Sequence, residues 1–117
     1  MGHGTEHEAN ATYAKLQGVF NDLGMDNYII GTVEAEPSLE DVVEMLKEGG
    51  YKKAVLEPLM VVAGDHANND MAGDEDDSWK SVIESEGFEV ECILRGLGEF
   101  PEVQNIYVKH VAEVIGK

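Results

Sequence analysis

Residues 28–60 read YIIGTVEAEPSLEDVVEMLKEGGYKKAVLEPLM and hold a strand, a helix and a second strand in succession. The β-branched run 28–33 predicts the first strand. Ser38 is a favourable N-cap for the helix, and a pair of glycines ends it. Residues 53–60 predict the second strand, whose ladder should weaken at Pro58, because proline has no N–H to donate.

The flanking sequence continues this alternation of helices and strands. Apolar residues spaced three and four apart predict a helix over residues 8–23, before the first strand. Beyond the second strand, the pattern predicts a long polar loop over 61–77, a helix over 78–86, a strand over 88–94 and a helix over 101–115. The inner face of the last helix is expected to carry Val103, Ile106, Tyr107, His110, Val111 and Val114.

This order of elements predicts an α/β fold with a parallel sheet covered by helices on both faces. Such a domain normally opens with a strand that becomes central, yet here the first helix follows Gly2-His3-Gly4-Thr5 directly. The first strand is therefore expected to be missing, which would leave a slot between strands 28–33 and 53–60. We expect residues 1–117 to form one domain, either a fragment of a two-lobe protein or one completed by another copy.

Composition and charge exclude several classes of function. The 117 residues suit one domain, and 24 acidic against 8 basic residues give a net charge of −16. Such a surface repels phosphate groups, so we expect no nucleic-acid or membrane partner. The single Cys92 excludes an intrachain disulfide and a cysteine-based metal site. No apolar run is long enough for a bilayer and no signal peptide is evident, so a cytoplasmic location is expected.

Three residues with metal-binding side chains fall at equivalent places in the predicted sheet. His3 precedes Glu34 by 31 residues, and Glu34 precedes His66 by 32, about one strand–helix unit each. Because ligands gather at the carboxyl ends of parallel strands, these residues are expected on one edge. Two imidazoles and a carboxylate suit Co, Ni, Fe(II) or Zn. The alternative is that two of the four histidines lie in loops by chance.

Other polar residues carry weaker signals. His7 is expected to cap a helix or lie on the surface, and His110 to be a buried core histidine. The acidic run 74–77 complements the dipole of the helix that follows it. The cluster within 65–70 lacks the glycine and glutamate that an EF-hand loop requires. There is no phosphate-binding lysine motif and no Gly-x-Ser-x-Gly, which excludes a P-loop enzyme and a serine hydrolase of that type.

Five segments together carry a resemblance to a known family. They are MGHGTEHEANATY at 1–13, GTVEAEPSL at 31–39, PLMVVAGDHANNDM at 58–71, DDSWK at 76–80 and GLGE at 96–99. Over essentially its whole length the chain resembles the C-terminal half of the anaerobic cobalt chelatases. These are the sirohydrochlorin cobaltochelatases of the class II chelatase superfamily. The segment around His66 is the most diagnostic of the five.

The resemblance implies a fold, a reaction and a set of roles. Family members have two flavodoxin-like lobes with the tetrapyrrole in the cleft between them. They insert Co(II), the metal substrate, into sirohydrochlorin or its factor II form without ATP or an organic cofactor, in anaerobic cobalamin biosynthesis. His3 and His66 correspond to the histidines that bind metal and accept pyrrole protons, and Glu34 to a third ligand. The expected partners are the tetrapyrrole and the N-terminal lobe of the parent protein or another copy.

Two alternatives and one further residue complete the expectations. The chain could be a non-catalytic metal- or tetrapyrrole-binding module, or a chelatase of the same superfamily that uses Fe(II) or Ni(II), since ligand type alone does not choose among these metals. Arg95, the only arginine, follows the strand 88–94. It is a candidate for binding the carboxylates of the substrate, or else it balances a nearby glutamate.

Overall fold

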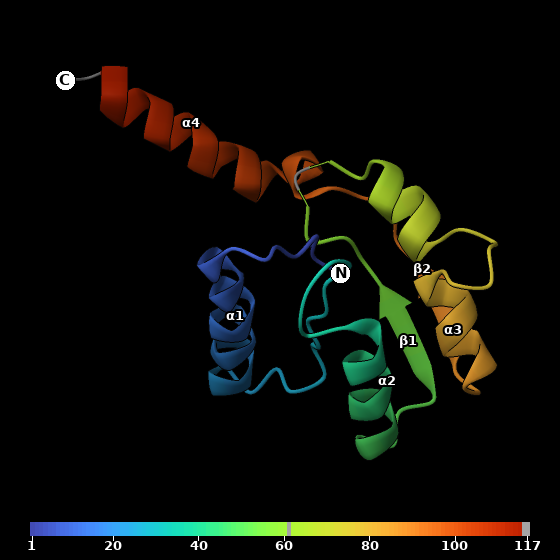
Figure 1. The fold of residues 1–117 in the computed structure, drawn as a ribbon. Coiled ribbons are helices and arrows are strands. Elements are labelled where there is room, and N and C mark those ends of the chain that lie inside the picture. Colours follow the sequence, from blue (N-terminus) through green and yellow to red (C-terminus); the bar gives the residue numbers. More distant parts are fainter. Residues whose placement is uncertain (61, 116–117) are drawn as a thin grey trace.

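The computed structural model describes residues 1–60 and 62–115. Figure 1 shows its elements in chain order. They are the 3₁₀ turn η1 (Glu8–Asn10), α1 (Ala11–Asp22), α2 (Leu39–Glu48), β1 (Lys53–Leu56), the π-helical turn η2 (His66–Met71), α3 (Trp79–Ser85), β2 (Glu89–Cys92), the 3₁₀ turn η3 (Leu97–Glu99) and α4 (Pro101–Ile115).

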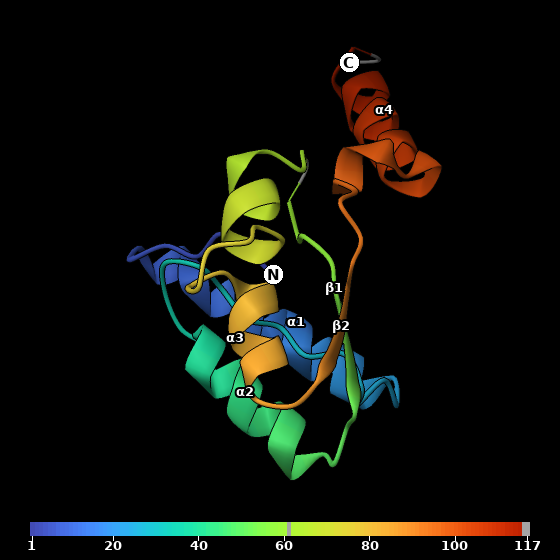
Figure 2. The same ribbon diagram turned by 90° about the vertical axis from the view of Figure 1, so that its right-hand side faces the viewer.

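A parallel pair of strands stands at the centre of the fold. β1 pairs with β2 in a register that sets Lys53 opposite Glu89 and Leu56 opposite Cys92. Helices α2 and α3 lie on the same side of this sheet (Figure 2). On the opposite side of β1 the side chain of Val55 is 52% exposed. The predicted α/β class with a parallel sheet is confirmed.

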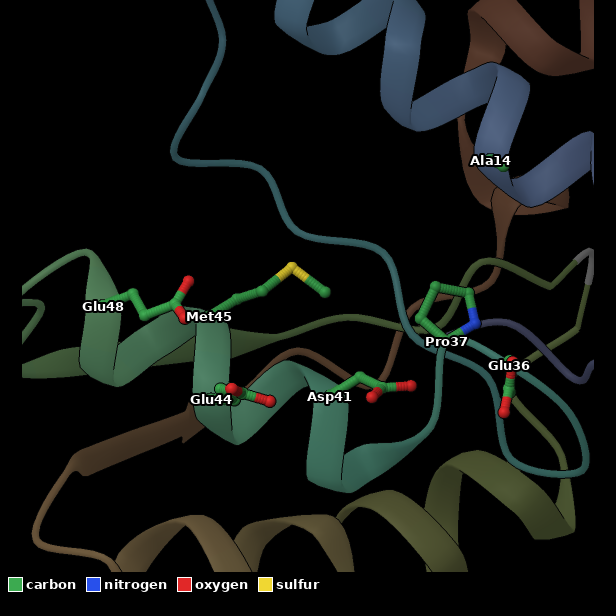
Figure 3. A pocket seen from close by; sticks show the side chains of 7 residues that line it. All are labelled: Ala14, Glu36, Pro37, Asp41, Glu44, Met45 and Glu48. Carbon is green, nitrogen blue, oxygen red and sulfur yellow. The ribbon is translucent and has the colours of Figure 1, made fainter.

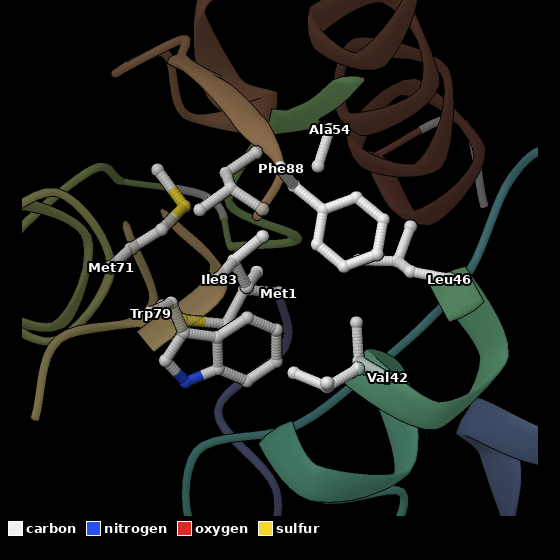
Figure 4. Close-up of a cluster of buried hydrophobic side chains, with 10 residues drawn as sticks. Met1, Val42, Leu46, Ala54, Met71, Trp79, Ile83 and Phe88 are labelled. Atoms are coloured by element: carbon white, nitrogen blue, oxygen red, sulfur yellow. The ribbon is translucent and has the colours of Figure 1, made fainter. Parts of the chain in front are cut away.

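The hydrophobic core lies between β1 and the two helices α2 and α3. Alternation along β1 sends Ala54 and Leu56 into this core, while Lys53 and Val55 face away. In Figure 4 the side chains of the core converge from segments that are far apart in the sequence. The cluster consists of Met1, Val42, Val43, Leu46, Ala54, Leu56, Met71, Trp79, Ile83 and Phe88.

The first four residues of the chain form an extended segment between two others. On one side, Gly2 donates its N–H to the Gly31 carbonyl at 2.8 Å and accepts from the Val33 N–H at 3.0 Å. On the other side, the Met1 carbonyl accepts from the Leu59 N–H at 2.7 Å. Residues 1–4 thus lie at the carboxyl-terminal end of the slot in which the sequence predicted a missing strand.

The predicted strand 28–33 is corrected by the structure. Within it only Thr32 forms a bridge, parallel to Gly2. Residues 28–31 lie beside the slot, where the described residues provide no neighbouring strand for them. Their outer edge is held by one side chain, because the Gln17 amide donates to the Tyr28 carbonyl at 2.7 Å and accepts from the Ile30 N–H at 2.8 Å. The segment is therefore extended but not paired as a strand over its length.

The expected lengths of two other elements also change. The strand predicted over 53–60 ends at Leu56, two residues before Pro58, as the missing proline donor suggested. The strand predicted over 88–94 is shortened to Glu89–Cys92. The predicted loop 61–77, whose residue 61 lies outside the described part, contains the helical turn η2. Ala67 and Met71 of this turn are fully buried, so their side chains anchor it to the rest of the protein.

Helix α4 forms as predicted, but its expected inner face is exposed. Ile106, Tyr107 and Val111 are all more than half exposed, and His110 is exposed as well. The helix projects away from the rest of the chain (Figure 1), so its apolar stripe has no neighbour there to pack against. The side chain of Val114 lies outside the described part. Among the described helices, none is both long and apolar enough to span a membrane.

The buried amino terminus predicts a pH-dependent stability. Burial lowers the pKa of the Met1 α-ammonium from 8.0 to about 6, partly opposed by the nearby Glu57 carboxylate. Between these values the unfolded chain binds more protons, so stability rises from pH 6 to pH 8. We expect Met1 to lower the free energy of unfolding at pH 6, relative to pH 8, by about 2 kcal/mol.

Urea unfolding of the chain with a free and with an acetylated Met1 measures this effect. The acetylated chain has the same histidines and carboxylates. The difference between the two chains in how the unfolding free energy changes with pH therefore reports on the amine alone. Equal dependence of the unfolding free energy on pH in both chains would contradict the assignment.

Candidate metal centre

The structure brings the three predicted ligands together. His3, Glu34 and His66 each offer one ligand atom, and these atoms all lie within 4.8 Å of one another. Two of the residues come from extended segments that pair through their backbones, and the third begins η2. From the spacing of about one strand–helix unit, the three residues were expected at one edge of the sheet. Their observed positions agree with this expectation.

His3 is presented by a turn that requires glycine at two places. Gly4 has a φ of +83°, a conformation that other residues rarely adopt, and a Cβ there would lie 2.8 Å from the Cβ of Thr32. A Cβ on Gly2 would collide with the ring of Tyr13. The same ring accepts a hydrogen bond from the Gly4 N–H through its hydroxyl at 3.2 Å. The turn is thus fixed between Tyr13 and Thr32, and it projects the His3 side chain outward.

Glu34 is joined to His3 through the backbone as well as by proximity. The Glu34 N–H donates to the His3 carbonyl at 2.9 Å, and the Glu34 Oε2 lies 3.6 Å from the His3 Nδ1. The side chains of His3 and Glu34 are 48% and 54% exposed. Both can therefore change rotamer and reach an incoming cation without disturbing the core.

His66 is held on the opposite side of the cluster by η2. Its Nδ1 lies 2.5 Å from the Oδ2 of Asp70, one helical turn later. With Nδ1 engaged in this way, Nε2 is the nitrogen left for a metal or a proton. The imidazole rings of His3 and His66 meet edge to face with their centroids 4.3 Å apart.

The three ligands can hold a single cation after their side chains adjust. Bonds from a first-row metal to histidine or carboxylate are about 2.0–2.2 Å long, so two ligands of one tetrahedral ion lie about 3.4 Å apart. The ligand atoms lie within 4.8 Å of one another in this structure, which exceeds that spacing by up to about 1.4 Å. Rotation of the exposed side chains closes such a gap, and the open side of the cluster leaves coordination positions free.

Asp70 is the residue of this site that the sequence did not reveal. In the sequence it belongs to the polar cluster within 65–70 of a predicted loop, where a spacing of four from His66 carries no meaning. Once residues 66–71 form a helical turn, that spacing places the two side chains on the same face. A carboxylate on one ring nitrogen fixes the tautomer and orientation of a metal-binding histidine.

The remaining sequence candidates lie outside the cluster. His7 caps η1 by accepting from the Ala9 N–H at 3.0 Å, as expected. Arg95 stacks its guanidinium 4.1 Å above the centroid of the Phe100 ring and donates to the Glu99 carbonyl at 3.2 Å. Burial raises the pKa of the Cys92 thiol above its ordinary value, which disfavours the thiolate that binds metals.

An acidic hollow lies beside α2, apart from the histidines. It encloses about 560 Å³ and is open to solvent (Figure 3). Four carboxylates line it, together with Ala14, Pro37 and Met45; they belong to Glu36, Asp41, Glu44 and Glu48. One of these carboxylates, that of Asp41, accepts from the Ser38 backbone N–H in the capping box of α2. Since none of the three candidate ligands lines this hollow, it does not belong to the metal centre.

The chain is similar to two proteins that are named as cobalt chelatases. The chain is 38% identical over 115 residues to the sirohydrochlorin cobaltochelatase of Salmonella typhimurium, an alignment that covers 98% of this chain and 43% of the relative. It is 35% identical over 116 residues to the sirohydrochlorin cobaltochelatase CbiKC of Nitratidesulfovibrio vulgaris, covering 98% and 40%. The chain thus spans less than half the length of these relatives.

The family match extends over the segments that build the cluster. A family model described as "Cobalt chelatase (CbiK)" matches residues 1–116. That range includes the glycine-flanked His3, the backbone-paired Glu34 and the helical turn of His66. The chain therefore belongs to the cobalt chelatase family.

Proposed function

We propose that this chain carries the metal-binding part of a site that inserts Co(II) into sirohydrochlorin or factor II, without ATP, in anaerobic cobalamin biosynthesis. The observation that carries the proposal is the convergence of His3, Glu34 and His66, with ligand atoms within 4.8 Å of one another. Membership of the cobalt chelatase family, and the names of two curated relatives, supply the metal and the tetrapyrrole.

Insertion requires the site to hold the cation first and then release it. The two imidazoles and the carboxylate bind Co(II), and Glu34 offsets one of its two positive charges. The pyrrole nitrogens of the macrocycle replace these ligands one after another as the metal enters. The same ligands also accept Fe(II) or Ni(II), so the choice of cobalt rests on the family and not on the ligand types.

Metallation also releases two protons from the pyrrole nitrogens, which need acceptors. A neutral imidazole is a suitable base near neutral pH. His66 accepts a proton at Nε2, while Asp70 holds Nδ1–H and stabilises the positive charge that develops on the ring. His3 serves the second proton from the other side, with Glu34 close to its Nδ1. The protons then pass to solvent, which reaches both exposed rings.

The cluster of His3, Glu34 and His66 is exposed and could cover only one face of the macrocycle. A second wall is needed to cover the other face. We propose that the wall comes from the N-terminal lobe of a parent protein or from another copy, because the relatives are more than twice as long. Arg95 stays our candidate for binding substrate carboxylates, since within the described residues its guanidinium forms no ion pair.

Removal of the histidines should abolish cobalt binding. We expect His3→Ala and His66→Ala each to weaken Co(II) binding by more than about 100-fold, because even the loss of an outer partner costs about 10- to 100-fold. Isothermal titration and the visible d–d absorption of Co(II) measure the effect. His110→Ala, on the exposed surface of α4, is the matched control and should bind as the parent chain does. Unchanged affinity in the double variant His3→Ala, His66→Ala would refute the site.

Asp70 should act through His66 and not on the metal directly. Asp70→Asn is expected to weaken Co(II) binding by about 10- to 100-fold and to shift the d–d spectrum, since the ring is no longer oriented by a carboxylate. Asp65→Asn removes the same charge from the neighbouring loop and is the control. If both variants had the same small effect, charge alone and not the His66–Asp70 contact would explain it.

The isolated chain should insert cobalt poorly. We expect little or no turnover from it in an absorbance assay with sirohydrochlorin, and recovery when it is fused to the N-terminal half of the Salmonella typhimurium relative. The reason is the missing second wall for the macrocycle. Turnover at the full rate by the monomeric chain would show that one lobe holds the substrate, contrary to this proposal.

A further inference from the structure

Asn10 directly precedes helix α1, but its side chain does not cap that helix. An asparagine at this position ordinarily accepts a hydrogen bond from a backbone N–H two or three residues later. Asn10 forms no such bond. Its Oδ1 accepts from the Thr5 N–H at 3.0 Å instead, and its Nδ2 donates to the Glu36 carbonyl at 2.7 Å. One side chain thus bridges two loops that are far apart in the sequence.

The two bridged loops carry two of the three candidate ligands. Thr5 lies two residues after His3, and Glu36 lies two residues after Glu34. The side chains of His3 and Glu34 are about half exposed, so packing does little to hold them. The separation of these two ligands is therefore set mainly by how the backbones of their loops are held together.

The bridge through Asn10 begins where the backbone pairing of the two loops ends. The bond from the Glu34 N–H to the His3 carbonyl, at 2.9 Å, is the last backbone hydrogen bond between the loops among the described residues. Beyond it, the Gly4 N–H donates to the Tyr13 hydroxyl at 3.2 Å. The Asn10 amide supplies the next connection and so extends the pairing past both ligands.

The loop that carries Glu34 is closed on itself by a buried threonine. The Thr32 N–H donates to the Pro37 carbonyl at 2.6 Å, and the Thr32 hydroxyl accepts from the Ala35 N–H at 3.2 Å. Only 1% of Thr32 is exposed. Because these bonds make the loop one closed unit, a contact at Glu36 holds the whole loop, including Glu34.

We propose that Asn10 is a positioning residue of the metal centre, whose amide holds the His3 loop and the Glu34 loop together before the cation arrives. Loops that are held in advance need not be ordered when the ion binds, so less of the binding free energy is lost. Both polar atoms of Asn10 are engaged in the bridge, so it acts through the loops and not as a ligand. This inference rests on the proposed function, from which it takes His3 and Glu34 as ligands.

Replacement of Asn10 tests the proposal, with Co(II) alone as the probe. Asn10→Ala removes both bonds of the bridge, and we expect Co(II) to bind about 10-fold more weakly in isothermal titration. The d–d spectrum of the complex should move toward that of Glu34→Ala. The reason is that Glu34 no longer meets the ion that the two histidines hold.

Gln17→Ala is the matched control for this variant. Gln17 lies on α1 as well, donates to the Tyr28 carbonyl at 2.7 Å and accepts from the Ile30 N–H at 2.8 Å. Both variants thus lose one donor and one acceptor contact to a neighbouring backbone, and urea unfolding should show similar losses of stability. Only Asn10→Ala should weaken Co(II) binding. Equal weakening in both variants, or none in Asn10→Ala, would overturn the positioning role.

A double-mutant cycle identifies the ligand through which Asn10 acts. In a Glu34→Ala background, Asn10→Ala should cost less than about twofold in Co(II) affinity, because residues that act together are not additive. In an Asp70→Asn background, which affects His66, its full effect of about 10-fold should remain. Additive effects of the Asn10 and Glu34 substitutions would show that Asn10 acts elsewhere, contrary to the inference.

The same set of variants separates this inference from the proposed function. If Glu34→Ala left Co(II) binding unchanged, the proposed metal site and the positioning role would both be wrong. If Glu34→Ala weakened binding and Asn10→Ala did not, the site would stand and only the role of Asn10 would be wrong. Circular dichroism checks that each variant is folded.

Hydrogen exchange of the parent chain tests the role without any variant. If the Asn10 bridge strengthens Co(II) binding, then Co(II) must strengthen the bridge by the same factor. Saturating Co(II) should therefore slow exchange of the Thr5 N–H, which bonds to Asn10, about 10-fold more than exchange of the Ile30 N–H, which bonds to Gln17. Equal slowing at both amides would refute the coupling.

Discussion

The hydrogen bonds of residues 1–4 to the segments on either side are the interaction on which the rest of the structure depends. Gly2 and His3 bond to residues 31–34, and Met1 bonds to residues 57–59. Through residues 1–3 these bonds tie residues 31–34 to residues 57–59, and they fix His3 beside Glu34. Because the chain reaches His66 only eight residues after Pro58, the same bonds bring the second histidine to the first.

The positions of the three candidate metal ligands could be predicted because parallel topology is regular. Each strand–helix unit returns the chain to the same sheet edge, so a spacing of 31 and 32 residues was enough to place His3, Glu34 and His66 together. The predictions that were wrong concern features that depend on contacts with residues distant in the sequence. Among residues 1–60 and 62–115, the segment 28–33 has strand composition but lacks a full partner, and the exposed apolar stripe of α4 has no neighbour to cover it. Asp70 became visible only with the helical turn η2, which tertiary burial of Met71 stabilises.

The charge of the chain has opposite effects on the two substrates of the proposed reaction. A net charge of −16 concentrates divalent cations around the protein but repels a macrocycle that carries carboxylates. Three lysines are engaged in surface ion pairs with acidic residues, Lys47 with Glu86, Lys53 with Glu91 and Lys80 with Asp74. Such exposed pairs stabilise the fold little but leave those cations less free to bind an anionic substrate. Under the proposed function, attraction of the macrocycle therefore falls to Arg95 and to whatever forms the second wall.

The exposure of the candidate metal centre suits a cation that is passed on better than a cation that is kept. A structural metal site is closed, with four protein ligands buried around the ion. Here the cluster has three candidate ligands, two of them about half exposed and the third 35% exposed. His66 is braced by the Asp70 carboxylate and the His3 Nδ1 lies 3.0 Å from the Gly4 carbonyl oxygen, but the side chains of His3 and Glu34 are about half exposed. Such a site binds the ion without enclosing it, so a macrocycle approaching from the open side can take over its coordination ligand by ligand.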